Sequence, residues 1–142
     1  MSDVVEHLTG LIRDRIAAVR ARDVEALAEQ FAEDVVIFDA VGRLRDQGRG
    51  AEVSRLETWF GSYQDDLGLG IRDIEIVAGD GVAFGHYLFR VTGTMVDGTE
   101  VSMWLRATVG FREFEDGWRI VHEHSSVPFD GATGEVLVGL EP

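Results

Sequence analysis

Two histidines flank a glutamate in RIVHEHSSVPF, residues 119–129, near the end of the chain. The segment is typical of a strand, in which successive side chains point to opposite faces. Either His122 and His124 face a functional cavity, or Glu123 does. An inward glutamate indicates an ion pair or proton transfer, whereas two histidines at this spacing can ligate zinc or iron. The neighbouring strand offers no evident third ligand, so interface hydrogen bonding is favoured for the histidines and no metal site is predicted.

Asp39 and His86 are further residues whose type and position could serve proton transfer. Asp39 directly follows the apolar run VVIF, residues 35–38. Apolar surroundings raise the pKa of a carboxyl group, which would let Asp39 act as a general base. The alternative is that Asp39 only initiates the turn that follows. His86 lies in GVAFGHYLFRV, residues 81–91, where it could shuttle a proton or donate to a ligand carbonyl. It could equally be a hydrogen-bonded core residue.

The amino-acid composition limits the reactions and partners that this chain could have. The chain has 142 residues and a net charge of -13, its 13 basic residues are all arginines, and it contains neither lysine nor cysteine. Schiff-base lysines, thiol nucleophiles, disulfides and cysteine-bound metals are therefore excluded. The negative charge argues against nucleic acid or an anionic membrane surface as partner. The acidic N-terminal segment has no signal-peptide pattern and no apolar stretch is long enough for a membrane span, which favours a cytoplasmic protein.

The order of the expected elements predicts one α+β domain over residues 1–142. Hydrophobic periodicity and turn signals predict helices over 3–21, 24–32 and 51–63, and strands over 35–39, 71–79, 81–96, 101–114 and 118–127. Such long strands should form a strongly curved antiparallel sheet with the helices on its concave face. The deep end of the resulting cone is a natural place for a small-molecule pocket.

Three segments carry a family resemblance: FAEDVVIFDAVG at 31–42, Gly48-Arg49, and DGWRIVHEHSSVPF at 116–129. With them the chain resembles the nuclear transport factor 2 (NTF2)-like superfamily, on its SnoaL-like and ketosteroid isomerase-like side, over nearly its whole length. The resemblance implies the cone-shaped fold and a homodimer. It leaves the activity open, because this superfamily hosts isomerases, dehydratases, epoxide hydrolases, polyketide cyclases and non-catalytic binding or assembly domains.

Ketosteroid isomerases provide the most detailed comparison. The resemblance puts their general-base aspartate at Asp39, whereas their two oxyanion donors fall on Arg15 and Ala107, so the donor pair is missing. Ketosteroid isomerisation itself is therefore not expected, because donors at the developing oxyanion contribute several powers of ten in rate.

The resemblance also predicts which side chains point into the cone. On the last strand it selects Glu123 over His122 and His124, and the apolar alternate positions of the preceding strand agree with that phase. A buried carboxylate needs a partner, and Arg90 is expected to be that partner, with Arg15 as a second. The pair could polarise a substrate or position water, or it could be a structural salt bridge that fixes the helix against the sheet. The remaining residues expected to line the ligand site are Trp59, Tyr63, Leu88, Leu105, Ala107, Ser125 and Val127, of which Trp59 and Tyr63 also fit a core role.

The sequence thus predicts a pocket for a small, largely apolar organic ligand that carries a carbonyl or hydroxyl group. The chemistry would be cofactor-free proton transfer of the isomerase, dehydratase or cyclase kind. Asp39 would be the base, Arg90 and His86 would polarise the ligand, and Glu123 would orient Arg90 and tune His86. The alternative is a non-catalytic ligand-binding or assembly domain of the same fold.

Overall fold

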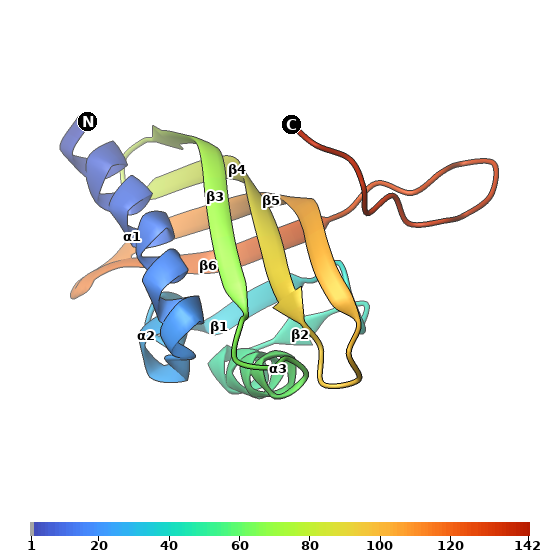
Figure 1. Cartoon of the computed structure of the whole chain (residues 1–142). Helices are drawn as coiled ribbons and strands as arrows, with labels where there is room; N and C mark the ends of the chain where they lie inside the picture. The colour runs from blue at the N-terminus through green and yellow to red at the C-terminus, as the bar shows by residue number, and fades with distance from the viewer. Residues whose placement is uncertain (1) are drawn as a thin grey trace.

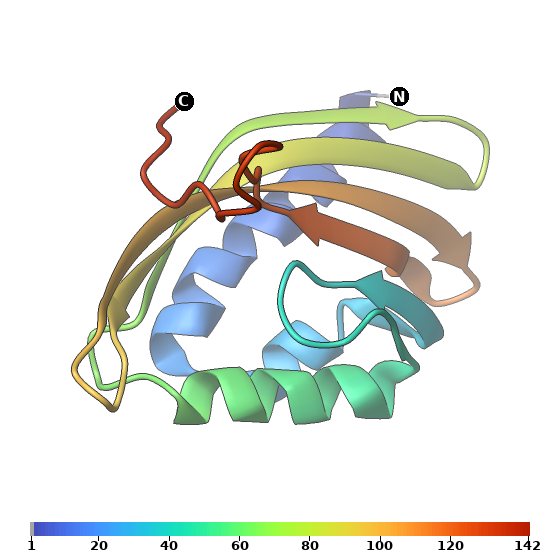
Figure 2. The ribbon, with the colours of Figure 1, turned by 90° about the vertical axis from the view of Figure 1, so that its right-hand side faces the viewer.

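Six strands form one curved sheet that arches over the helices (Figures 1 and 2). The computed structural model describes residues 2–142. In chain order the elements are α1 (Ser2–Ala21), α2 (Val24–Ala28), β1 (Phe31–Phe38), β2 (Asp46–Gln47), α3 (Arg49–Gly61), β3 (Gly68–Ala78), β4 (Val82–Thr94), β5 (Glu100–Phe114) and β6 (Gly117–Ser126). The predicted α+β architecture with helices inside a curved sheet is confirmed.

The sheet order is β2-β1-β6-β5-β4-β3, and most neighbouring strands are antiparallel, as predicted. The β1–β6 pair is parallel, with Ile37 opposite Glu123. The predicted second helix was too long, because α2 already ends at Ala28 and the chain enters β1 at Phe31. The parallel pairing brings the C-terminal ends of β1 and β6 together, and with them the carboxylates of Asp39 and Glu123.

Helix α1 buries one stripe of side chains against the concave face of the sheet. Leu8, Ile12 and Val19 lie on this stripe and are almost fully buried. Their spacing of four and seven residues is that of one helix face. Arg15 occupies the same stripe and is buried with them. The helix therefore carries a charged group into the interior of the cone.

The interior contains two apolar clusters. One surrounds Leu8, Ile12, Val109 and Phe111, and the other surrounds Val19, Leu56, Phe60, Leu105 and further residues between α3 and the sheet. In the part of the chain that the structure describes, no helix has the length and apolar character needed to cross a membrane. The two clusters form the apolar surroundings of the interior polar groups.

Candidate functional site

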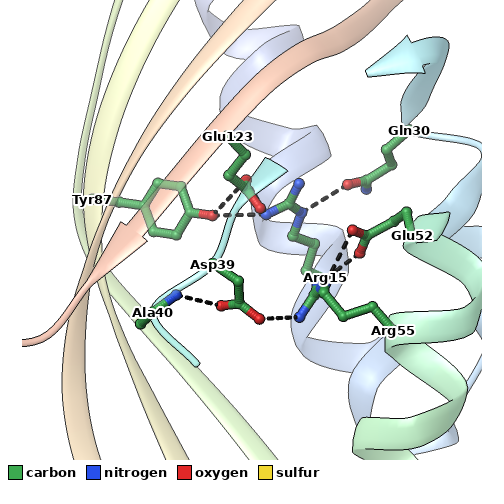
Figure 3. Close-up of polar contacts among 8 residues, drawn as sticks. All are labelled: Arg15, Gln30, Asp39, Ala40, Glu52, Arg55, Tyr87 and Glu123. Atoms are coloured by element: carbon green, nitrogen blue, oxygen red, sulfur yellow. Dashed lines mark hydrogen bonds and ion pairs between the residues drawn. The ribbon is translucent and has the colours of Figure 1, made fainter. Parts of the chain in front are cut away.

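Arg15 is the centre of a buried polar network that joins four segments of the chain (Figure 3). Its Nε donates to Oε1 of Gln30 at 2.8 Å, and its Nη1 donates to the hydroxyl of Tyr87 and to Oε1 of Glu123, both at 2.7 Å. The Tyr87 hydroxyl in turn donates to the same Glu123 oxygen at 3.2 Å. Helix α1, the segment before β1, and strands β4 and β6 are thereby tied together.

The Nη2 atom of Arg15 has no hydrogen-bond partner among the described residues, although it is shielded from solvent. A guanidinium group carries five N–H donors and remains charged in proteins. Three of them are used here, so both N–H groups on Nη2 are unsatisfied. A buried donor without a partner costs about 1–3 kcal/mol, and more when it is charged. The network is therefore incomplete at one defined atom.

The electrostatics of this network favour a charged arginine beside a neutral tyrosine. Burial alone would lower the pKa of the Arg15 guanidinium, but the Glu123 carboxylate raises it, and the net pKa lies above its ordinary value. Burial raises the pKa of Tyr87, and the nearby Glu123 carboxylate adds to this. Tyr87 therefore keeps its proton at neutral pH and can donate it in a hydrogen bond.

A second polar cluster lies beside the first and connects α3 to the end of β1 (Figure 3). Arg55 binds both oxygens of Glu52, at 2.7 and 3.1 Å, and its Nη1 donates to Oδ2 of Asp39 at 3.0 Å. The other Asp39 oxygen accepts from the backbone N–H of Ala40. The charges of Arg15 and Glu123 act on Glu52, so the two clusters form one electrostatic unit.

Glu52→Gln is expected to change how stability depends on pH. Burial raises the pKa of the Glu52 carboxyl group above its ordinary value, so the folded state binds a proton that the unfolded state releases at lower pH. The stability that Glu52 contributes is therefore fully present below the unfolded pKa of about 4.3 and is lost as the pH rises through the folded pKa. Thermal unfolding between about pH 4 and pH 7 should show the Tm of the wild type falling relative to that of the variant.

The control for this experiment is Glu57→Gln, an exposed position on the same helix. Its Tm difference from the wild type should stay constant over the same pH range. A constant difference for Glu52→Gln as well would contradict a raised pKa at this buried carboxyl group.

The predicted positions of Asp39 and Glu123 agree with the geometry. Glu123 is buried inside the cone, where Val109 is its neighbour on β5 and Ile37 its neighbour on β1. Asp39 follows β1 directly and is half-buried. The partner of Glu123 is Arg15, which the sequence suggested only as the second choice, and Arg90 does not contribute.

Three residues of β4 that were predicted to face the interior of the cone point away from it. His86, Leu88 and Arg90 lie on the convex face, where His86 is exposed near Glu75 and Arg90 donates to the hydroxyl of Ser102. Paired residues on neighbouring antiparallel strands share a face. Because Tyr87 pairs with the buried Ala107, the side chains that enter the interior are those of Ala83, Tyr87, Phe89 and Val91.

The other predicted lining residues lie inside the cone, mainly as core. Leu105, Ala107 and Tyr63 are buried, and Trp59 packs edge-on against Tyr63, with ring centroids 6.5 Å apart. Burial raises the pKa of Tyr63 as well. Ser125 and Val127 are half-buried beyond Glu123, and Val127 packs on the second apolar cluster.

His122 and His124 lie on the convex face, as the sequence predicted. Each contacts the ring of Phe38 edge-on, and Nδ1 of His122 donates to the carbonyl oxygen of Val36 at 2.7 Å. Within residues 2–142 no group of three or more histidine or carboxylate side chains is placed to hold a metal ion.

Sequence reasoning missed Tyr87, Gln30, Arg55 and Glu52. Tyr87 lies between His86 and Leu88, which were predicted to point inward, so the alternation of the strand placed it on the outer face. The position of Arg15 on an otherwise apolar helix stripe was a readable signal of a buried charge. No comparable signal marks Glu52, because acidic residues are common in the first turn of exposed helices.

Similar structures exist for the whole chain. A protein of unknown function from Pseudomonas putida KT2440, described as NTF2-like, is 30% identical, covers 100% of this chain and 99% of its own, and superposes with a TM-score of 0.91. An NTF2-like superfamily protein from Salmonella enterica is 20% identical over 94% and 97% of the two chains, with a TM-score of 0.82. A candidate dehydratase of the NTF2-like family from Streptomyces avermitilis is 17% identical over 92% and 100%, with a TM-score of 0.79.

No match was found among curated proteins. The SnoaL-like domain family matches residues 9–130, which include every residue of the two interior polar clusters. This match and the full-length similarity to the Pseudomonas putida protein agree with the curved sheet and its enclosed helices. The chain belongs to the SnoaL-like domain family and has the NTF2-like fold.

Proposed function

We propose that the interior of the cone binds a small organic molecule through an oxygen atom and that the protein catalyses cofactor-free proton transfer on it, as an isomerase or dehydratase does. The observation that carries this proposal is the buried Nη2 of Arg15, a charged donor with no partner among residues 2–142. A carbonyl, enolate or carboxylate oxygen of a ligand supplies the missing acceptor. Charge-assisted hydrogen bonds of this kind are about twice as strong as neutral ones.

The surroundings of Arg15 suit a ligand whose body is apolar. Leu8, Ile12, Ala107 and Val109 belong to the cluster on one side of the network, and Leu105 belongs to the cluster on the other. Apolar walls strengthen the hydrogen bond to the ligand oxygen, because water does not compete for the donor. Ligand pockets commonly combine apolar walls with a few oriented polar groups.

The neighbouring carboxylates provide the proton-transfer groups. Asp39 would remove a proton from the carbon next to a ligand carbonyl, and the electrons of that C–H bond would form an enolate whose oxygen Arg15 binds. Returning the proton to another carbon gives an isomer, and loss of a hydroxyl group as water from the next carbon gives a dehydrated product. Glu123 would act as a positioning residue that holds Arg15 and Tyr87 in place.

The comparisons support the class of reaction only as a starting point. The candidate dehydratase from Streptomyces avermitilis and a candidate aromatic ring hydroxylase from Novosphingobium aromaticivorans share the fold at 17% and 18% identity. Identity at this level shows a shared fold and does not carry a reaction from those proteins over to this chain. The proposal therefore depends on the interior charges of this chain.

Arg15→Lys is the variant that tests the role of Arg15 in ligand binding. Lysine keeps the positive charge but lacks the planar fork that reaches two partners on one side and a ligand on the other. We expect ligands found by thermal shift among enolisable ketones, 2-oxo acids and hydroxy acids to lose at least about tenfold in affinity, as measured by titration calorimetry. Hydrocarbon analogues without the oxygen should bind the two proteins equally.

The matched control is Arg13→Lys, an exposed arginine on the same helix, which should bind every ligand as the wild type does. Equal affinity of oxygen-bearing ligands for the wild type and for Arg15→Lys would overturn the assignment of Arg15. Oxygen-dependent binding without any proton exchange on the bound ligand would support the binding step and refute the catalytic one.

A further inference from the structure

Glu52 is the most deeply buried carboxylate in the part of the chain that the structure describes, and the proposed chemistry gives it no role. Its side chain is 0% exposed, whereas those of Glu123 and Asp39 are 9% and 20% exposed. Burying a carboxylate is costly even when the group is paired. The ion-pair partner of Glu52 among residues 2–142 is Arg55, one helical turn away on α3. By itself this pair connects no separate elements of the fold, so it does not explain why a charge is buried there.

Arg55 presents separate edges of its guanidinium group to two carboxylates (Figure 3). Its Nε and Nη2 donate to Oε2 and Oε1 of Glu52 at 3.1 and 2.7 Å, and its Nη1 donates to Oδ2 of Asp39 at 3.0 Å. A bidentate bond fixes the plane of a guanidinium group. Once Glu52 has fixed that plane, the direction of Nη1 is fixed as well. Glu52 on α3 therefore determines how Arg55 holds Asp39 at the end of β1.

The charge of Glu52 also bears on the proposed base. An arginine within about 4–6 Å of a carboxylate favours the ionised form, which makes the carboxylate a weaker base. A weaker base removes a proton from carbon more slowly. The negative charge of Glu52 offsets the positive charge of Arg55 that Asp39 meets. Arg55 can therefore hold Asp39 in place with a smaller loss of basicity than a lone arginine would cause.

Two further charged groups act on Glu52 from other elements. Burial raises the pKa of Glu52, the hydrogen bond and charge of Arg55 lower it, Glu123 of β6 raises it and Arg15 of α1 lowers it. The effects of Glu123 and Arg15 oppose each other, so Arg55 is the group that links the charge of Glu52 to Asp39. Because the net pKa is raised, Glu52 takes up a proton at a higher pH than an exposed glutamate does, and its offset of the Arg55 charge is then lost.

We propose that Glu52 is a positioning residue of the proton-transfer site, which aims Arg55 at Asp39 and offsets its charge so that Asp39 is held in place and still acts as a base. The inference rests on the proposed function, because it takes Asp39 as the group that removes the ligand proton. Protonation of Glu52 removes its charge and turns one of its two acceptor oxygens into a donor. The site is therefore active while Glu52 is ionised, and its activity falls as the pH decreases and Glu52 is protonated.

The pH dependence of proton exchange tests this role. The probe is 2-tetralone, an apolar enolisable ketone, and the readout is deuterium incorporation in excess of the rate without protein, followed by NMR between about pH 4 and pH 8. For Glu52→Gln we expect the maximal rate at saturating ketone to fall at least about threefold and the acidic limb of the profile to move to lower pH, because the charge of Arg55 is no longer offset. KM should change little, since Arg15 is untouched. A merely structural role would lower Tm and leave the pH profile unchanged.

Two control variants on α3 make the result specific to the charge of Glu52. Glu52→Asp keeps the charge and should restore the pH profile more closely than Glu52→Gln does. Glu57→Gln removes an exposed carboxylate of the same helix and should exchange at the wild-type rate at every pH. Carbon-13 NMR of the wild type without ligand needs no variant to fold. In that titration the signal of the Asp39 carboxyl carbon should shift at the pH at which the Glu52 signal titrates.

Two results would overturn the role of Glu52. One is exchange that requires Asp39 but shows the same maximal rate and pH profile in the wild type and in Glu52→Gln, which would leave the proposed function standing. The other is an Asp39 signal that does not respond when Glu52 titrates. Failure of the wild type to exchange 2-tetralone would instead count against the proposed function, and the ligand-free titration would still decide whether Glu52 acts on Asp39.

Discussion

Arg15→Met is expected to lower the free energy of unfolding by about 3–5 kcal/mol, the loss typical of breaking a buried ion pair from one side. Methionine fills much of the same space but cannot neutralise Glu123, which would stay buried with only the Tyr87 hydroxyl beside it. Gln30 and Tyr87 would also lose a donor. For a domain of this size the change corresponds to a fall in Tm on the order of 10 °C.

The measurement is urea-induced unfolding of the wild type and the variant at neutral pH. Arg13→Met is the control, because Arg13 is exposed on the same helix and its replacement should change stability by no more than about 0.5 kcal/mol. Equal losses for the two variants would show that the buried pair does not stabilise the fold.

A double variant separates the stranded charge from the lost contacts. In Arg15→Met/Glu123→Gln the buried carboxylate is gone, and the amide oxygen still accepts from Tyr87. Replacing both members of a buried ion pair by neutral groups is often far less costly than removing one. We expect the double variant to recover at least half of the stability lost by Arg15→Met. A double variant less stable than the single one would mean that the contacts, and not the uncompensated charge, dominate.

The fold was predictable because its signals are redundant. The apolar stripe of α1, the long alternating strands and the hairpin turns each indicate helices packed inside a curved sheet. The phase of β5 and β6 was also readable, since Leu105, Ala107 and Val109 form a uniformly apolar set opposite a mixed one. That set determines that Glu123, which pairs with Val109, points inward.

The candidate site was only partly predictable, and β4 shows why. Both faces of β4 carry apolar side chains, so hydrophobicity alone does not show which face is inside the cone. Phe84 and Leu88 lie on one face, and Tyr87 and Phe89 lie on the other. The pairing of β4 with β5 decides which face is inside, because Tyr87 lies opposite the buried Ala107. A hairpin register depends on turn geometry, which sequence comparison without gaps does not capture. The error moved His86 and Arg90 into the site and left Tyr87 out.

Glu52 and Arg55 illustrate a different limit. Both lie on α3, where the apolar side chains of Leu56 and Phe60 are the sequence signal for the buried face of the helix. Glu52 is fully buried, and Arg55 from the next helical turn binds it while also binding Asp39 at the end of β1. This contact depends on how α3 lies against β1, which is a tertiary property that no local pattern in the sequence specifies.

Asp39→Asn is expected to reduce proton exchange on a bound ligand by at least about 100-fold, the usual contribution of a general base. Asparagine keeps the shape of the side chain, but its single oxygen can accept from Arg55 or from the backbone N–H of Ala40 and not from both, as Asp39 does. One of these hydrogen bonds is lost, so Tm should fall slightly, while the main loss should appear in the exchange rate and not in ligand affinity. Nuclear magnetic resonance in deuterated water measures this directly, as deuterium incorporation next to the carbonyl group of an enolisable ketone.

Two further variants make the result specific to Asp39. Asp34→Asn replaces an exposed carboxylate on β1 and should exchange ligand protons at the wild-type rate. Glu123→Gln should weaken ligand binding more than it lowers the exchange rate at saturation, because Glu123 orients Arg15 without touching the reacting carbon. If Glu123→Gln abolished exchange while Asp39→Asn retained it, the base would be the buried carboxylate of β6. Asp39 would then be a structural partner of Arg55, and proton transfer would take place at the Arg15–Tyr87 network itself.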